Sequence, residues 1–133
     1  MNRALWPLTY CAPEIIIDEP YTQAVDMWSL GVMTYLMLSG RLPFNAKDET
    51  DIARKVAFDE PDFTKHSCWS KISNEAKDFT KRLLAKKAKN RMNIKEALEH
   101  DWIKKYSKND IFEDRKKNNE GGDKFMAYSS VTK

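Results

Sequence analysis

The sequence has few of the residues on which several kinds of site depend. It holds only two cysteines, Cys11 and Cys68, and neither belongs to a C-x-x-C pair or to a His/Cys cluster. Because zinc sites and disulfide frameworks need more such residues at closer spacing, we interpret both as free thiols in a reducing cytosol and expect no metal site. The few glycines form no G-x-G-x-x-G phosphate-binding loop.

Long apolar runs are also scarce. The longest, residues 24–38, is shorter than the ~20 residues that a bilayer span requires, and it contains Asp26. The opening residues MNRALWPLTY hold no apolar stretch of signal-peptide length. We therefore expect a cytoplasmic, intracellular chain without a membrane partner.

The net charge of +3 is too small to indicate a nucleic acid as partner, and 32% charged with 41% hydrophobic residues is typical of a soluble globular protein. A nucleic-acid binder would have to use one basic stretch, but apolar positions interrupt it and no DNA-binding motif accompanies it. We interpret the stretch as a solvated face. Its members are Lys77, Lys81, Arg82, Lys86, Lys87, Lys89 and Arg91.

The apolar pattern predicts helices throughout and no sheet, so the expected fold class is all-α. One helix is predicted to start at Thr22 and to end before Gly40, and it is hydrophobic on all sides, as a buried central helix is. A second, polar helix is predicted over residues 48–57, where Asp48 is the candidate N-cap. That helix is expected to lie on the surface.

Beyond residue 57 the pattern alternates between irregular and helical. Residues 58–73 are expected to form a loop held in place by Phe58, Phe63 and Trp69. Ser73 is a candidate N-cap for a helix with the apolar face Ala76, Phe79, Leu83 and Leu84.

The next helix is predicted to begin at Asn93, which forms a near capping box with Glu96. Its expected inner face is Ile94, Ala97, Leu98 and Trp102. From residue 106 to 133 the sequence is polar with scattered aromatics, which predicts a tail that is disordered or ordered only by a partner.

Five motifs occur in order along the chain: YCAPE, DMWSLGV, SGRLPF, AKDFTKRLL and RMNIKEALEHDW. With them, Thr9 to Ile103 resembles the C-terminal part of the large lobe (C-lobe) of a eukaryotic Ser/Thr protein kinase. The last three motifs, with CWSKIS, most resemble the calcium/calmodulin-dependent protein kinase group. The resemblance implies an incomplete C-lobe over residues 9–105, preceded by a non-matching leader at 1–8 and followed by the tail.

The resemblance also implies roles for three charged residues. Asp26 matches the family's aspartate that accepts backbone N–H bonds from the catalytic loop and so anchors it. Glu14, the A-P-E glutamate, matches one partner of an ion pair at the end of the activation segment, and Arg91 matches the other. Read without the family, Asp26 is a first-turn acid favoured by the helix dipole by ~0.3–1 kcal/mol, and Arg91 is one more member of the basic stretch.

Leu8, Thr9 and Tyr10 match residues that line the pocket for the substrate side chain in the family. The sequence departs from the family here, because Trp6-Pro7-Leu8 replaces the usual Gly-Thr-Pro. Truncation at a boundary, with unrelated leading residues, is the interpretation we favour over an altered pocket. Leu36 stands where many kinases directed to basic substrates carry a glutamate, which puts that preference in doubt.

The catalytic parts of a kinase do not occur in this sequence. It contains no Gly-rich loop, strand lysine motif, H-R-D or D-F-G. We therefore expect no catalytic residue and no bound cofactor in this chain, whereas ATP and Mg²⁺ are expected for the complete kinase, which acts on protein substrates. The alternative hypothesis is a non-catalytic kinase-like interaction module that binds a regulatory protein through the helix at 48–57 or through the tail.

Overall fold

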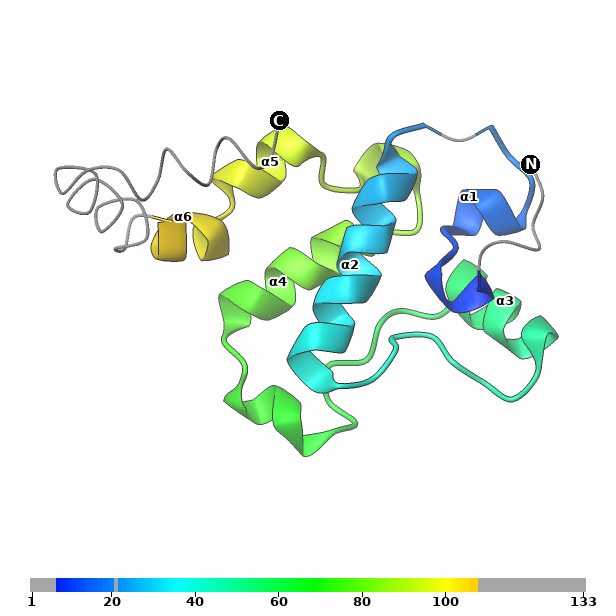
Figure 1. Cartoon of the computed structure of the whole chain (residues 1–133), viewed down its shortest axis with the longest axis horizontal. Helices are drawn as coiled ribbons and strands as arrows, with labels where there is room; N and C mark the ends of the chain where they lie inside the picture. Colours follow the sequence, from blue (N-terminus) through cyan, green and yellow to red (C-terminus); the bar gives the residue numbers. More distant parts are fainter. Residues whose placement is uncertain (1–6, 21, 108–133) are drawn as a thin grey trace, which may run out of the picture. The chain divides into compact units, whose positions relative to one another are not determined.

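The structure, a computed structural model, describes residues 7–20 and 22–107. Within these residues it contains helices and no strand, which confirms the all-α prediction (Figure 1). The chain divides into two compact units, Met1–Leu98 and Glu99–Lys133. None of the helices in the described part is long and apolar enough to cross a membrane.

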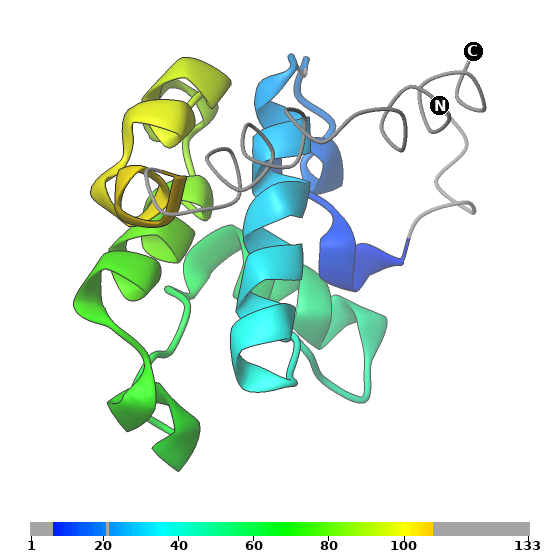
Figure 2. The same cartoon turned by 60° about the vertical axis from the view of Figure 1, so that its left-hand side comes forward.

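The first unit is organised around α2 (Ala24–Ser39). Helix α4 (Asn74–Leu83) packs along it, as both views show (Figures 1 and 2). The short helix α1 (Pro13–Ile16) and the 3-10 turn η2 (Leu8–Tyr10) pack against α3 (Glu49–Phe58). The remaining elements are the 3-10 turns η3 (Ser67–Lys71) and η4 (Ala88–Asn90) and helices α5 (Ile94–Glu99) and α6 (Asp101–Ser107).

Side-chain caps explain where three of the helices begin. Asp48 accepts a hydrogen bond from the Thr50 N–H at the start of α3, and Ser73 does the same for Ala76 at the start of α4. Before α5, the Asn93 side chain accepts from the Glu96 N–H while Glu96 accepts from the Asn93 N–H, so the predicted capping box is complete. These local signals account for the agreement between predicted and observed helix starts.

Helix α2 starts slightly later than predicted and ends as predicted. Gln23, not Thr22, occupies the cap position, although the Thr22 hydroxyl accepts a bond from the Ala24 N–H. At the other end Gly40 adopts φ 73°, a left-handed conformation that glycine reaches without steric cost. The Gly40 N–H donates to the Leu36 carbonyl and closes the helix.

The core of the first unit joins residues that are far apart in sequence. Tyr35 on α2, Phe63 and Trp69 form an aromatic cluster, in which the Trp69 ring lies 4.8 Å from each of the other two ring centroids. Trp28 stacks on Phe44 with centroids 5.8 Å apart. The main buried cluster contains Ala12, Trp28, Val32, Tyr35, Phe44, Ile52, Val56, Trp69 and Leu84.

Two sequence expectations about packing are wrong. Phe58 does not hold the loop in place, because it ends α3 with 79% of its surface exposed, outside the face that buries Ile52 and Val56. Ile94 and Leu98 do not form an inner face, since they are 61% and 63% exposed. The six-residue helix α5 buries only Ala97.

The predicted helix from residue 93 is also interrupted near residue 100. The His100 side chain accepts a hydrogen bond from the Trp102 N–H through Nδ1, and the His100 carbonyl accepts from the Lys104 N–H. A side chain that captures a backbone N–H in this way starts a new helix instead of continuing the old one. The apolar spacing alone therefore overestimated the length of this helix.

Gly31 sets the distance between α2 and α4. A Cβ atom at this position would lie 2.8 Å from Leu83 Cβ and 2.9 Å from Leu84 Cδ2. We expect Gly31→Ala to lower the free energy of unfolding by about 1–2 kcal/mol, because the overpacking cost exceeds the gain in helix propensity. Urea unfolding followed by circular dichroism measures this. The control is Met37→Ala, which alters a side chain 76% exposed on the same helix and should change little; equal effects of the two substitutions would contradict the packing argument.

Candidate functional site

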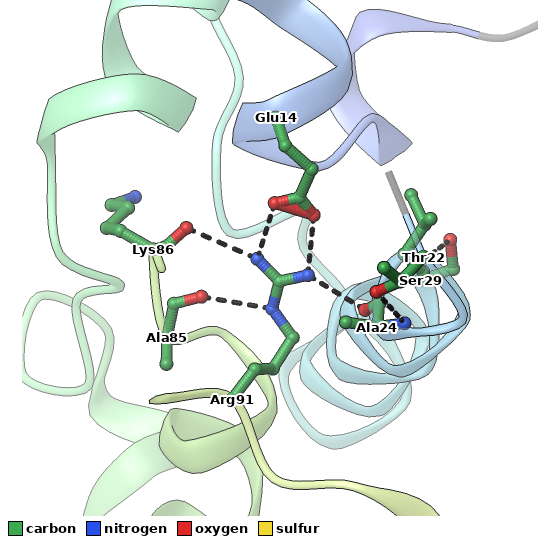
Figure 3. Close-up of polar contacts among 8 residues, drawn as sticks. Glu14, Thr22, Ala24, Ser29, Ala85, Lys86 and Arg91 are labelled. Carbon is green, nitrogen blue, oxygen red and sulfur yellow. Dashed lines mark hydrogen bonds and ion pairs between the residues drawn. The ribbon is translucent and has the colours of Figure 1, made fainter. Parts of the chain in front are cut away.

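Glu14 and Arg91 form a buried ion pair across 77 positions of sequence. Arg91 Nη1 lies 2.6 Å from Glu14 Oε1 and Nη2 lies 3.1 Å from Oε2, so the contact is bidentate (Figure 3). The Arg91 side chain has 0% of its surface exposed and that of Glu14 7%. A planar guanidinium and a carboxylate in this geometry form strong charge-assisted hydrogen bonds.

The backbone satisfies the remaining donors of Arg91. Nε donates to the Ala85 carbonyl at 3.0 Å, and Nη1 donates to the Ala24 carbonyl at 2.8 Å. Nη2 donates to the Lys86 carbonyl at 3.3 Å, so every guanidinium N–H has an acceptor (Figure 3). The side chain thereby ties α1, the start of α2 and the segment after α4 to one another.

Local structure explains how both charged groups come to be buried. Glu14 lies in the first turn of α1, behind Pro13, where the helix N-terminus favours an acidic side chain. Arg91 follows η4, and its own N–H donates to the Ala88 carbonyl. The family resemblance pointed to both residues. It did not point to the three backbone carbonyls, because every residue has a carbonyl and the sequence does not show which ones accept a hydrogen bond from Arg91.

Asp26 lies in the first turn of α2 but apart from the ion pair. Its side chain is exposed, and no hydrogen bond of its carboxylate occurs among residues 7–20 and 22–107. It lines an open hollow of about 690 Å³ together with Met27, Arg91 and Ile94. The structure therefore places the exposed Asp26 carboxylate at the edge of a hollow whose wall includes the buried arginine.

Leu8, Thr9 and Tyr10 form η2, in which the Tyr10 N–H donates to the Pro7 carbonyl. All three residues are half-buried, and Leu8 and Tyr10 pack against the core cluster. The core cluster therefore holds η2 in place, while part of each of the three side chains remains accessible to solvent. Its role in substrate binding stays a prediction.

Lys86 is a residue of the site whose environment the sequence did not reveal. Instead of lying on a solvated face, it is half-buried, with Nζ 4.1 Å from the Phe44 ring centroid and 5.4 Å from that of Trp28. Arg91 lies over the same Trp28 ring, with Cζ 5.1 Å from its centroid. Burial lowers the pKa of Lys86 to about 8, and the nearby charge of Arg91 acts in the same direction.

The lowered pKa of Lys86 predicts a pH-dependent stability. The unfolded chain keeps this proton up to its ordinary pKa of 10.5, so between pH 8 and 10.5 the unfolded state binds more protons than the folded state. Stability contributed by this group must therefore rise with pH in that window. We expect the difference in Tm between the unmodified protein and Lys86→Met to shift in favour of the unmodified protein from pH 7.5 to 9.5. A difference that does not change with pH would contradict this.

Comparison with known proteins agrees with this geometry. Residues 1–103 match the family model described as protein kinase domain, including residues 1–8, which the sequence motifs do not reach. The chain is 46% identical over 94 residues to serine/threonine-protein kinase H2 of Homo sapiens, covering 71% of the chain and 24% of that protein. It is 43% identical over 107 residues to CDPK-related kinase 8 of Arabidopsis thaliana, covering 80% of the chain and 17% of the relative.

Among solved structures, the twitchin kinase region from C. elegans superposes with a TM-score of 0.68 at 37% sequence identity. The match covers 71% of this chain and 17% of that one. The chain thus spans at most about a quarter of the length of these relatives. By sequence and by fold, it belongs to the protein kinase family and corresponds to part of a Ser/Thr kinase domain.

Proposed function

We propose that this chain is the C-lobe part of a Ser/Thr protein kinase that transfers the γ-phosphate of ATP to Ser or Thr of protein substrates. The buried, bidentate contact between Glu14 and Arg91 carries the proposal. In this assignment the chain alone supplies scaffold and peptide docking and has no activity of its own. Residues 9–105 are the kinase-like part, and the tail from 106 lies almost wholly outside the described residues.

Each site residue has a role in this proposal. The Glu14–Arg91 pair holds the end of the activation segment, which is α1, against the helical body. Asp26 accepts backbone N–H groups of the catalytic loop, and its exposed carboxylate beside the open hollow suits a segment that is not part of this chain. Leu8, Thr9 and Tyr10 line the pocket for the substrate.

The residues of this chain do not fit ATP and Mg²⁺. Across the described residues, no three His, Cys, Asp or Glu side chains are grouped as metal ligands. The sequence also lacks a phosphate-binding glycine loop and the D-F-G aspartate that holds magnesium in kinases. In this proposal ATP and Mg²⁺ bind to residues of the complete kinase that this chain does not contain.

A phosphoryl-transfer assay on two proteins tests the proposal. One is the 133-residue chain, and the other is the longest translated product that contains it. With radiolabelled ATP, Mg²⁺ and casein, we expect incorporation of label only with the longer product, and a large loss of it for Glu14→Ala in that product. Label transfer by the 133-residue chain itself would refute the proposal. If no longer product exists, the non-catalytic interaction module, with α3 or the tail as binding surface, takes its place.

An apolar stripe on α2 predicts self-association of the isolated chain. Leu30, Met33 and Met37 occur at helical spacing and are 37%, 52% and 76% exposed. Such a stripe on a lone chain favours association with another copy. We expect Met33→Glu with Met37→Glu to shift the chain toward monomer in sedimentation velocity, by about tenfold in the association constant. Phe58→Glu, at an exposed apolar residue elsewhere, is the control; an equal shift for the control would show that the stripe is not the interface.

A further inference from the structure

The amine of Lys86 has an unusual position for a lysine. It lies over the faces of two stacked rings, 4.1 Å from the Phe44 centroid and 5.4 Å from that of Trp28. Its hydrogen bond to the Lys55 carbonyl is long, at 3.4 Å. The side chain points away from the Arg91 guanidinium, while the Lys86 carbonyl accepts from it (Figure 3).

The charges around this amine do not offset its burial. Asp59 and Glu60, which follow α3, favour the protonated amine, and Arg91 opposes it. Within residues 7–20 and 22–107, neither carboxylate lies within ion-pair distance of the Lys86 Nζ, whereas the partners in Arg54–Asp51 and Arg91–Glu14 do lie within that distance of each other. The Lys86 ammonium group has one long hydrogen bond and lies against the rings of Phe44 and Trp28, so it loses much of its hydration. This loss favours the neutral amine.

We propose that Lys86 is an acylation site of this chain, with acyl thioesters as the acyl donors. The neutral Nζ attacks the thioester carbonyl carbon, a C–N bond forms, and the C–S bond breaks. The thiolate leaves and the nitrogen loses one proton to solvent, so the products are an amide and a thiol. No other reactant is needed.

The surroundings of the Lys86 amine, which are the Phe44 and Trp28 rings and the Lys55 carbonyl, suit the N-acyl lysine as well as the free amine. An N-acyl lysine keeps one N–H, which can still donate to the Lys55 carbonyl. Its flat, uncharged amide can lie on the Phe44 ring, and it no longer repels Arg91. Because no ion pair is lost, acylation at Lys86 leaves the contact between Glu14 and Arg91 in place.

The test measures the acylation rate at each lysine of the folded chain. The chain is incubated with acetyl-coenzyme A at pH 7.5, and site occupancy over time is followed by peptide mass spectrometry. The exposed Lys81 on α4 is the internal reference. At pH 7.5 a pKa near 8 leaves ~20% of the amine neutral against ~0.1% for an ordinary lysine, and partial burial reduces this advantage, so we expect Lys86 to react ~10-fold faster than Lys81.

Two comparisons test whether a faster reaction at Lys86 comes from its folded surroundings or from the residues next to it in sequence. In 6 M guanidinium chloride the ratio of the two rates is expected to fall to about one. Phe44→Leu removes the aromatic ring beneath the Lys86 amine and keeps an apolar side chain. It should lower the acylation rate at Lys86 toward that at Lys81. Equal rates at Lys86 and Lys81 in the folded chain, or a preference that persists in denaturant, would overturn the proposal.

Discussion

Replacing Arg91 with alanine is expected to lower the free energy of unfolding by about 3–5 kcal/mol, because Glu14 would be left buried without its cation. Arg91 also donates to three carbonyls from two separate segments, so several acceptors lose their donor together. For a domain of this size the loss corresponds to a fall in Tm of roughly 12 °C or more. Thermal unfolding followed by circular dichroism measures it directly.

The chain supplies a matched control in the exposed pair Arg54–Asp51, which is 3.6 Å apart with 66% and 51% of the two side chains exposed. Arg54→Ala should change stability by less than ~0.5 kcal/mol, since solvent screens such pairs. Arg91→Lys keeps the charge and loses the bidentate geometry, so its effect should be intermediate. If Arg91→Ala were no more destabilising than Arg54→Ala, the buried pair would not be what holds α1 in place.

Replacing Trp69 with alanine should destabilise the chain by about 3–5 kcal/mol, the range for removing a large aromatic side chain from a core. Trp69 is 1% exposed and contacts both Tyr35 and Phe63, so the cavity would open inside the aromatic cluster. This cluster joins α2 to the loop before η3, a region without long helices of its own. Urea unfolding monitored by circular dichroism gives the change in free energy.

The control for Trp69 is Phe58→Ala, because the sequence assigned both residues the same role and the structure separates them. Phe58 is 79% exposed, so its truncation should leave stability within ~0.5 kcal/mol of the unmodified chain. A large loss for Phe58→Ala would mean that it packs more tightly than the structure shows. A small loss for Trp69→Ala would mean that the aromatic cluster contributes little.

Local signals in the sequence predicted the helices well where a cap marked their start. Asp48, Ser73 and Asn93 each cap a helix as expected, because an N-cap bond joins residues only two or three positions apart. The helix from Asn93 was predicted too long, since its apolar spacing continues past His100 while a side-chain hydrogen bond restarts the backbone there. Periodicity reports a preference for a helix and does not report such a competing bond.

The resemblance to protein kinases implied that Glu14 and Arg91 form a pair, and the structure brings the two together at 2.6 Å. Composition and spacing assigned Lys86 to a solvated face, and that prediction is wrong because Lys86 is half-buried. Sequence spacing placed Lys86 among other basic residues, but the approach of Phe44 and Trp28, from distant segments, decides its environment. Its pKa follows from that packing.

The family, the helical class and most helix starts could be predicted from the sequence, because each motif and each capping bond involves residues close together in the chain. The packing of distant segments sets which apolar residues are buried, as the exposed Phe58 and Met37 and the buried Trp69 show. It also decided which backbone carbonyls receive Arg91 and how Lys86 is desolvated. The burial of a side chain and the direction of a backbone carbonyl depend on how distant segments pack together. The residue types near that position in the sequence do not reveal this packing.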